Sequence, residues 1–158
     1  MTSAKLGEPI PDLEVQATDE QIFRLSELQG QNVVLYFYPK DNTPGCTTEG
    51  QDFRDHHDEF KALDTVIFGI SRDSLKSHES FKNAQCFPFD LISDADEALC
   101  RAFDVIKEKN LYGKVTVGIE RSTFVIDKKG VLRKEFRKVK VDGHVREVLN
   151  ALKRLPQG

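Results

Sequence analysis

Cys46 stands at a junction of the sequence where a thiol can become reactive. An apolar run, residues 33–38, stops at Pro39, and a short polar turn leads from there to Cys46. Beyond Cys46, apolar residues such as Phe53 and Phe60 return at helical intervals. The pattern predicts a buried strand followed by a helix that holds Cys46 at or near its first turn.

A thiol at the start of a helix lies in a favourable field. The first backbone N–H groups of a helix have no internal partners, and the aligned peptide dipoles leave partial positive charge there. This environment favours the thiolate, which is the nucleophilic form of cysteine. The preceding Pro44-Gly45 pair fits a tight turn, and Thr43 can offer a hydroxyl beside the sulfur. The sequence therefore predicts an activated cysteine.

A cysteine paired with a histidine would instead indicate acyl transfer. His56 lies ten residues after Cys46, and at ~1.5 Å of rise per residue a helix separates the two by roughly 15 Å. One of His56 and His57 falls in the apolar stripe and is interpreted as a packed residue. His78 and His144 could approach by folding back, but no motif points to them. A cysteine hydrolase is not favoured.

Composition places the chain among ordinary globular proteins. Its 158 residues, 39% hydrophobic and 31% charged, predict a single domain over residues 1–158. A net charge of −3 gives no reason to expect a nucleic-acid or anionic-membrane partner. The basic cluster of residues 133–140 is interpreted as the solvated face of a strand, with a local docking patch as the alternative.

Localisation and cysteine usage point the same way. The sequence holds no apolar run of ~20 residues and its N-terminus lacks the apolar core of a secretion signal, so we expect a cytoplasmic protein without a membrane partner. Its three cysteines have irregular spacing, which fits neither a disulfide framework nor the paired spacing of a zinc site. Redox or nucleophilic use is the remaining role for a cysteine.

The order of elements predicts the fold class. Strands are expected near residues 13–15, 33–37, 66–70, 91–92, 117–119, 122–126 and 131–139, and helices over 25–28, 46–63, 73–85, 94–103 and 142–155, the last ended by Pro156. Residues 106–116 are expected to be a loop. Alternating strands and helices, then an antiparallel pair and a closing helix, predict an α/β fold with a central mixed β-sheet flanked by helices.

Two segments carry a resemblance to a known family. Residues 38–47 read Tyr-Pro-Lys-Asp-Asn-Thr-Pro-Gly-Cys-Thr, and residues 118–127 read Gly-Ile-Glu-Arg-Ser-Thr-Phe-Val-Ile-Asp. Both resemble peroxiredoxins, in particular the PrxQ subfamily, also called bacterioferritin comigratory protein. The similarity runs along nearly the whole chain. It implies a thioredoxin-like fold and the reduction of hydroperoxides without a metal, flavin or haem cofactor.

The resemblance also implies roles for individual residues. Cys46 would be the peroxidatic cysteine, Thr43 would orient the peroxide, and Pro39 would shield the pocket. Arg121 would place its guanidinium beside the sulfur, where a cation favours the thiolate. Glu49, one helical turn after Cys46, either holds Arg121 in place or is a solvated first-turn acid.

The resolving step is where the sequence departs from its relatives. Many PrxQ proteins carry a second cysteine five residues after the first, and here that position is Gln51. Others carry the partner in the next helix, near Lys82 of this chain. Cys86, at the end of that helix, is our choice of resolving cysteine.

Two alternatives to Cys86 remain open. Cys100 lies off the apolar stripe of its own helix and is interpreted as a bystander, and an external thiol could resolve the sulfenic acid directly. A disulfide needs Cα atoms within about 7 Å, so two cysteines on separate helices imply local unfolding during turnover. We expect recycling by thioredoxin or a similar dithiol, and a monomer.

Other functions of the same fold class fit the sequence less well. A thioredoxin-like disulfide carrier needs a CxxC motif, which is absent from the sequence. A glutathione peroxidase uses a tryptophan near its reactive centre, and the chain has none. A binding module without enzymatic activity would leave Thr43, Cys46 and Arg121 together by coincidence. The preference between hydrogen peroxide and larger organic hydroperoxides stays open.

Overall fold

The computed structural model describes residues 3–155, apart from the side chain of Leu111. Its strands are β1 (Glu14–Ala17), β2 (Gln21–Arg24), β3 (Asn32–Phe37), β4 (Thr65–Ser71), β5 (Asp90–Ser93), β6 (Ile106–Leu111), β7 (Lys114–Ile119), β8 (Ser122–Ile126) and β9 (Leu132–Phe136). Its helices are η1 (Leu25–Leu28, a 3-10 turn), α1 (Pro44–Asp55), α2 (His57–Ala62), α3 (Leu75–Gln85), α4 (Ala98–Ala102) and α5 (His144–Lys153).

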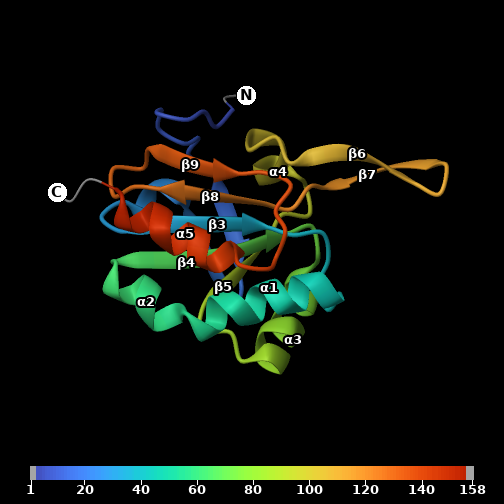
Figure 1. Ribbon diagram of the computed structural model, residues 1–158, viewed down its shortest axis with the longest axis horizontal. Helices are drawn as coiled ribbons and strands as arrows, with labels where there is room; N and C mark the ends of the chain where they lie inside the picture. The colour runs from blue at the N-terminus through green and yellow to red at the C-terminus, as the bar shows by residue number, and fades with distance from the viewer. Residues whose placement is uncertain (1–2, 156–158) are drawn as a thin grey trace.

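Seven strands form one mixed sheet in the order β2-β1-β5-β4-β3-β8-β9 (Figure 1). The central strands β3, β4 and β5 run parallel, while β8 pairs with β3 antiparallel. Parallel strands end at the same edge of a sheet, so the loops after β3 and β4 lie together. The predicted α/β fold, a central mixed sheet with helices on both faces, is confirmed.

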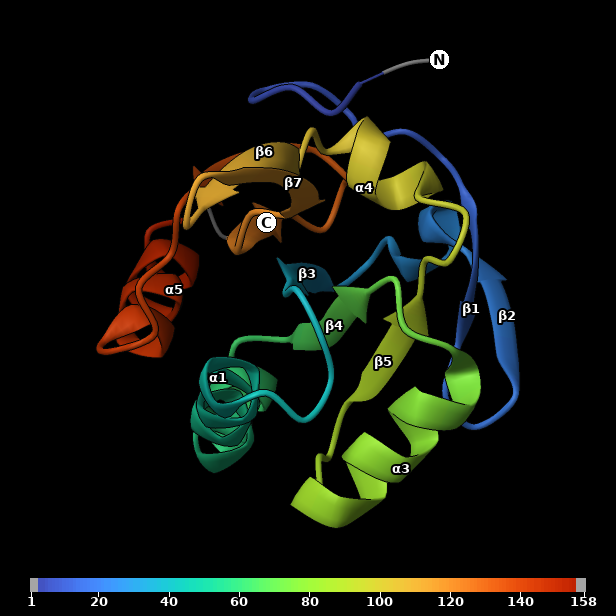
Figure 2. The same ribbon diagram turned by 90° about the vertical axis from the view of Figure 1, so that its right-hand side faces the viewer.

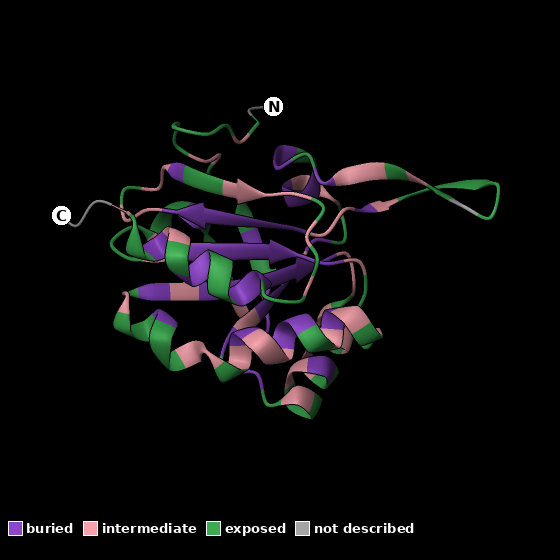
Figure 3. Cartoon of the chain, in the orientation of Figure 1, coloured by how far each residue is buried: buried purple, intermediate pink, exposed green. Residues whose placement is uncertain are grey.

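The sheet separates two apolar cores, because successive side chains of a strand point to opposite faces. Val34, Tyr36 and Tyr38 face a core completed by α1, α2, α3 and α5. Leu35 and Phe37 face a second core that includes residues of η1 and α4. Figure 2 shows this division, with α1, α3 and α5 on one side of the strands and α4 on the other. Strands β3 and β8 are buried along nearly their whole length (Figure 3).

The junction between β3 and α1 has the predicted form. The Tyr38 N–H extends the parallel ladder by donating to the Ile70 carbonyl at 3.0 Å. The chain then turns, and Thr43 precedes α1 in an extended conformation with Pro44 as the first helical residue. Proline suits this position because its missing N–H would have no helical partner there. Cys46 is the third residue of the helix.

The loop predicted for residues 106–116 is wrong. These residues form most of the β6–β7 hairpin, which pairs Ile106 with Ile119 and projects from the body of the protein (Figure 1). The two residues between the strands, Tyr112 and Gly113, both have positive φ. A two-residue turn of this kind matches the twist of a hairpin, and the β-branched residues after it favour a strand. The charged composition concealed this signal.

The helix predicted from Cys46 to about residue 63 is two helices. His56 leaves helical geometry with φ −106° and ψ 11°, and it separates α1 from α2. The two helices still bury one continuous apolar face, because Phe53 and Phe60 pack together with ring centroids 5.7 Å apart. The spacing of apolar residues therefore predicted the buried face of the two helices but not the break between them at His56.

The helix predicted to start at Asp94 begins later. Glu97 has φ +65°, which a right-handed helix excludes, so α4 starts at Ala98. Asp94 nevertheless serves the helix start, because its carboxylate accepts the N–H groups of Leu99 and Cys100 at 3.0 and 2.8 Å. The prediction of an Asp94–Glu97 capping box is wrong, while Asp94 as a partner of helix N–H groups is right.

Smaller boundaries also shift. Ser74, and not Asp73, caps α3, and its hydroxyl accepts the N–H of Ser77 at 3.1 Å. The strand expected over residues 131–139 is the shorter β9. The stop assigned to Pro156 lies outside the described residues. Within residues 3–155, no helix is long and apolar enough to cross a membrane.

Gly50 is the point where α1 meets the segment after α3. A Cβ at this position would lie 2.4 Å from Cζ of Phe87, a buried ring. We therefore expect Gly50→Ala to displace Phe87 and to lower the free energy of unfolding by about 1–3 kcal/mol, the usual cost of overpacking. Urea denaturation measures this change.

Thr48→Ala is the matched control for Gly50→Ala, because Thr48 is exposed on the same helix. Its effect should stay within about 0.5 kcal/mol, as for most surface substitutions. Equal effects of the two substitutions would contradict the close packing of α1 on Phe87.

Candidate active site

Cys46 is nearly enclosed, with 2% of its surface exposed. It belongs to the core on the α1 side of the sheet, which also contains Tyr36 and Phe53. One polar side chain approaches its sulfur: Nη2 of Arg121 donates to Sγ at 3.4 Å. A guanidinium at this distance interacts more favourably with a thiolate than with a thiol.

Arg121 is held in a fixed orientation between Cys46 and Glu49. While Nη2 faces the sulfur, Nη1 donates to Oε1 of Glu49 at 2.6 Å. Gly45 leaves room for the guanidinium, since a Cβ there would lie 3.1 Å from Nη2. The Arg121 carbonyl accepts the N–H of Val139, which ties down the backbone just before β8. Arg121 approaches Cys46 as predicted. Of the two interpretations of Glu49, the contact agrees with the first, in which Glu49 holds Arg121 in place.

The ion pair lies in a strongly desolvated place. Burial raises the pKa of Glu49 to about 7, although the Arg121 cation acts in the opposite direction. Burial also acts to lower the pKa of Arg121, but the carboxylate and the sulfur outweigh it and the pKa is raised. Arg121 therefore stays cationic. Oε2 of Glu49 is buried without a hydrogen-bond partner among the described residues.

Tyr36 forms the apolar floor of the site. Its ring stacks on Phe53 at a centroid distance of 4.5 Å, and its hydroxyl is buried with no hydrogen-bond partner in residues 3–155. Burial, followed by the negative charges of Glu49 and Cys46, raises the pKa of Tyr36 well above its ordinary value. Tyr36 thus stays neutral, and this side of the sulfur excludes water.

Thr43 and Pro39 lie in the loop that leads to Cys46, and both are half-buried. The Thr43 hydroxyl donates to the Lys40 carbonyl at 2.8 Å. Because its proton is used there, its oxygen can accept a hydrogen bond from a bound O–H group. Among the described contacts, none joins Thr43 directly to the sulfur of Cys46.

Cys86 is exposed and does not contact Cys46. It ends α3 in the left-handed conformation, with φ 54° and ψ 44°, and its Sγ lies 3.9 Å from the Asn83 carbonyl. The adjacent Gln85 contacts the later part of α1: its side chain accepts from Gln51, and its carbonyl accepts from Arg54. Gln51 and Arg54 lie five and eight residues after Cys46, roughly 7.5 and 12 Å along the helix axis. A direct disulfide is out of reach in this conformation.

Cys100 is fully buried on the opposite face of the sheet. Burial, and then the negative charge of Asp94, raises the pKa of this thiol far above its ordinary value. A thiol held in its protonated form is a poor nucleophile. This environment agrees with the interpretation of Cys100 as a bystander.

The histidines do not serve the sulfur. Nδ1 of His56 lies 2.8 Å from the Asp52 carbonyl, inside its own helix. His144 is hydrogen-bonded to Thr123 at 2.7 Å, and burial, with a smaller effect of Arg121, lowers its pKa to about 4. Neither forms the Cys–His pair of a cysteine hydrolase.

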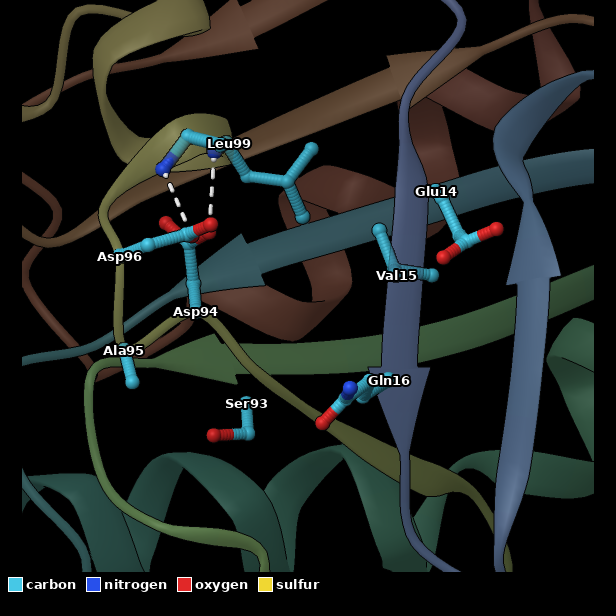
Figure 4. Close-up of a pocket in the computed structure, with 9 residues that line it drawn as sticks. Glu14, Val15, Gln16, Ser93, Asp94, Ala95, Asp96 and Leu99 are labelled. Carbon is cyan, nitrogen blue, oxygen red and sulfur yellow. Dashed lines mark hydrogen bonds between the residues drawn. The ribbon is translucent and has the colours of Figure 1, made fainter.

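A polar cavity lies elsewhere, between β1, the end of β5 and α4 (Figure 4). Its volume is about 310 Å³, and Glu14, Gln16, Ser93, Asp94 and Asp96 supply its polar groups. Figure 4 shows Asp94 accepting the Leu99 N–H rather than offering a free carboxylate. The residues that line it include no cysteine, histidine or cation, so it offers no competing reactive centre.

One group of residues near the site was missed by the sequence reasoning. Asp41, in the loop before Cys46, is joined to Tyr38, Ser77 and His78 by side-chain hydrogen bonds of 2.6–2.8 Å. Asp41 lies within the motif of residues 38–47 but received no role, and no motif pointed to His78. No spacing rule connects residues 37 positions apart, so only the fold brings them together.

With this geometry in hand, comparisons with known proteins are informative. The sequence matches the AhpC/TSA family over residues 6–135. The chain belongs to this family, as a peroxiredoxin of the PrxQ type. It is 52% identical over 149 residues to Peroxiredoxin Bcp of Bacillus subtilis, covering 94% of this chain and 95% of that protein. It is 60% identical over 124 residues to Peroxiredoxin Bcp of Xanthomonas campestris, covering 78% of each.

Solved structures agree with the sequence relatives. The fold is similar to that of Xanthomonas campestris Peroxiredoxin Q, with a TM-score of 0.86, 54% identity and 89% of each chain covered. The resemblance noted in residues 38–47 and 118–127 is thereby confirmed, as is the thioredoxin-like fold. This peroxiredoxin is a peroxidase that uses a thiol.

The raised pKa of Glu49 gives its ionisation a cost in stability. A carboxyl whose pKa is higher in the folded state holds its proton more tightly there than in the unfolded chain. The contribution of Glu49 to the free energy of unfolding is therefore full below pH ~4.5 and is lost as pH rises through about 7. We expect Glu49→Gln to remove this dependence. Relative to the variant, the wild type should lose about 1–3 kcal/mol of unfolding free energy between pH 5 and pH 8.

Urea denaturation at several pH values measures this difference. Glu59→Gln is the control, since this carboxylate is exposed and pairs with Arg146 at the surface. A difference between wild type and Glu49→Gln that is constant from pH 5 to pH 8 would contradict the desolvation of Glu49.

Proposed function

We propose that this peroxidase reduces hydrogen peroxide and organic hydroperoxides through a sulfenic acid on Cys46. The observation that carries the proposal is the guanidinium of Arg121, fixed between the Cys46 sulfur and the Glu49 carboxylate in the first turns of α1. It supplies positive charge and directed N–H groups where an anionic sulfur reacts.

The first step transfers one oxygen atom. The Cys46 thiolate attacks the nearer peroxide oxygen, the O–O bond breaks, and the departing oxygen leaves as an alkoxide or hydroxide that takes up a proton. Negative charge moves from the sulfur to that oxygen. Arg121 and the free N–H groups at the start of α1 are placed to stabilise the charge throughout. The sulfur is oxidised and the peroxide is reduced to an alcohol or water.

The loop residues position the substrate. The Thr43 oxygen can accept a hydrogen bond from the peroxide O–H, because the Thr43 hydroxyl already donates its own hydrogen to the Lys40 carbonyl. Pro39, half-buried beside it, shields the pocket from water. Glu49 acts through Arg121, because its charge and its 2.6 Å contact keep the guanidinium aimed at the sulfur.

We assign resolution of the sulfenic acid to Cys86. Its thiolate attacks the sulfur of Cys46, a disulfide forms, and water leaves. Solved structures of Xanthomonas campestris Peroxiredoxin Q include two cysteine-to-serine variants at sites 36 positions apart, from 48 to 84 in that protein. The position 36 residues after Cys46 is Lys82, whereas Cys86 follows one helical turn later. A cysteine that directly follows the same helix is thus available, one turn further along.

Resolution by Cys86 requires a change of shape. Gln85 and Phe87 are packed on α1 beyond Cys46, so the end of α3 or the first turns of α1 must unwind before the sulfurs meet. A dithiol such as thioredoxin then reduces the disulfide and restores both thiols. The monomeric state, the cytoplasmic location and the single domain over residues 1–158 stay predictions.

A second candidate is resolution by an external thiol. The separation of Cys86 from Cys46 in this conformation favours this route, because an external thiol does not depend on the unwinding of α3. The two routes differ in product, since one gives an intramolecular disulfide and the other a mixed disulfide on Cys46.

Replacing Cys46 tests the peroxidase mechanism. Cys46→Ser should reduce hydrogen-peroxide consumption by at least about 10³-fold, because no thiolate remains to attack. Cys100→Ser is the control and should keep a rate within about twofold of wild type, provided that it folds. Both rates are measured with dithiothreitol as reductant. Equal rates for wild type and Cys46→Ser would remove Cys46 from the mechanism.

Replacing Cys86 tests the resolving step. After one equivalent of peroxide, the wild type should lose about two mass units through a new disulfide that peptide mapping places between Cys46 and Cys86. Cys86→Ser should instead gain about 16 mass units on Cys46, the mass of one oxygen atom. An intramolecular disulfide that persists in Cys86→Ser would assign resolution to another cysteine.

A further inference from the structure

A buried cluster of polar groups lies between the catalytic loop and α3. At its centre is Asp41, which is 5% exposed. Its Oδ1 accepts the hydroxyl of Tyr38 at 2.6 Å, and its Oδ2 accepts the hydroxyl of Ser77 at 2.8 Å and faces Nδ1 of His78 at 2.7 Å. Burial acts to raise the pKa of Asp41, but these hydrogen bonds, that of His78 first, outweigh it and the pKa is lowered.

The partners of His78 define its protonation. The ring is completely buried, and its Nε2 lies 2.9 Å from the carbonyl of Ile92. A carbonyl oxygen can only accept, and so can the ionised carboxylate of Asp41. Both ring nitrogens must then carry hydrogen, which makes His78 an imidazolium and the contact with Asp41 a buried ion pair. Tyr38 and Asp73 are the other titratable groups that contact Asp41.

We propose that Asp41 and His78 form a buried ion pair that positions the catalytic loop and fixes the first half of α3, so that only its second half unwinds to deliver Cys86. The part concerning Cys86 rests on the proposed function. Neither residue contacts the reacting sulfur, and both act through the backbone that carries Pro39 and Thr43.

On the loop side, the pair acts within a network that orders the backbone. Asp41 lies between Pro39 and Thr43, and its N–H donates to Oδ2 of Asp73 at 2.8 Å. The Ser71 hydroxyl donates to the same Asp73 oxygen at 2.7 Å. The loop after β3 is thereby tied to the loop after β4. A shift of Asp41 would move Thr43 and the start of α1 with it.

On the helix side, the attachments change in kind along α3. Its first turn is held by Ser74, by Ser77 and by His78, whose ring reaches both Asp41 and β5. The later residues are held by partly buried polar contacts. Lys82 pairs with Asp19 and Asp90, and Gln85 bonds to α1 through amide and carbonyl contacts.

This difference predicts where α3 opens. Breaking a completely buried ion pair leaves an uncompensated charge, whereas partly exposed pairs and amide contacts exchange with water at a lower cost. Phe81 is the last completely buried apolar side chain of the helix. Local unfolding should therefore stop near His78 and include Lys82 through Cys86.

A cation site is the competing interpretation of this cluster. Ligand atoms of Asp41, Asp73 and His78 lie within 4.8 Å of one another. Each of these atoms already has a protein partner, and Nδ1 of His78 is directed at the carboxylate itself. The geometry thus points to an ion pair.

The ring nitrogens of His78 provide a test that is independent of activity. In ¹⁵N-labelled wild type at pH 7, without added metal, both nitrogens of His78 should show the chemical shifts of a protonated imidazolium, and Asp41→Asn should convert the ring to its neutral form. A neutral ring in the wild type would overturn the proposal. So would a shift of Nδ1 on adding zinc at an equimolar concentration, which would indicate a cation site instead.

A double-mutant cycle tests the positioning role. Asp41→Asn and His78→Gln should each lower the rate constant for oxidation of Cys46 by hydrogen peroxide about tenfold or more. The double variant should lose less than the product of the two effects, because neither charge is left unpaired. Asp94→Asn, which alters an equally buried carboxylate near α4, should stay within about twofold of wild type.

Two results would overturn this role: independent effects in the cycle, or an equal loss in Asp94→Asn. Where a single variant fails to fold, Ser77→Ala replaces it, since it removes one donor from the same oxygen of Asp41.

Hydrogen exchange of the oxidised wild type shows which part of α3 unwinds. The amides of Ser77 and His78, which donate to Ser74, should stay protected and those of residues 82–86 should not. Equal exchange of the two sets would contradict the division.

These readouts separate the two hypotheses. If Cys46 is not the oxidised residue, no oxidation of Cys46 is seen in the wild type and the proposed function fails, while the ring-nitrogen spectrum still reports the ion pair. If the ion pair is absent, the spectrum shows a neutral ring although Cys46 is oxidised normally.

Discussion

The contact on which the site depends is the charged chain from the Cys46 sulfur through Arg121 to Glu49. All three groups are largely withdrawn from water, and burying a charge without a partner costs several kcal/mol. The contacts of 3.4 and 2.6 Å offset part of that cost, because the guanidinium reaches both partners at once. Removing one member leaves the others uncompensated, so the geometry of the reactive sulfur and the stability of this region are linked.

The pairing of β3 with β8 in the sheet brings Cys46 and Arg121 together. Cys46 follows β3 and Arg121 precedes β8, and these strands pair antiparallel with Phe37 opposite Ser122. The end of one strand therefore meets the start of the other at the same edge of the sheet. Gly45 then permits the close approach of Arg121, which any side chain at that position would crowd. Residues 75 positions apart become neighbours through backbone pairing alone.

The sequence carried the local parts of this arrangement and missed those that depend on tertiary contacts. Cys46 at a helix start follows from the change of period after Pro39, and the buried strands follow from their continuous apolar runs. The β6–β7 hairpin was missed because charged side chains on a projecting ribbon carry no burial pattern. The late start of α4 depends on a positive φ at Glu97, and the partnership of Asp41 with His78 depends on how α3 packs. Neither leaves a periodic trace in the sequence.

Cys46 and Cys86 occupy opposite settings, as the proposed mechanism requires. In that mechanism the attacking sulfur must be fixed, because charge stabilisation depends on donors that are already in place when the O–O bond breaks. The sulfur of Cys86 must move, because the end of α3 contacts α1 beyond Cys46. Cys46 lies accordingly in a buried core, and Cys86 lies at an exposed helix end in a left-handed conformation that strains a non-glycine residue. Unwinding the end of α3 releases that strain, which lowers the cost of the motion proposed for Cys86.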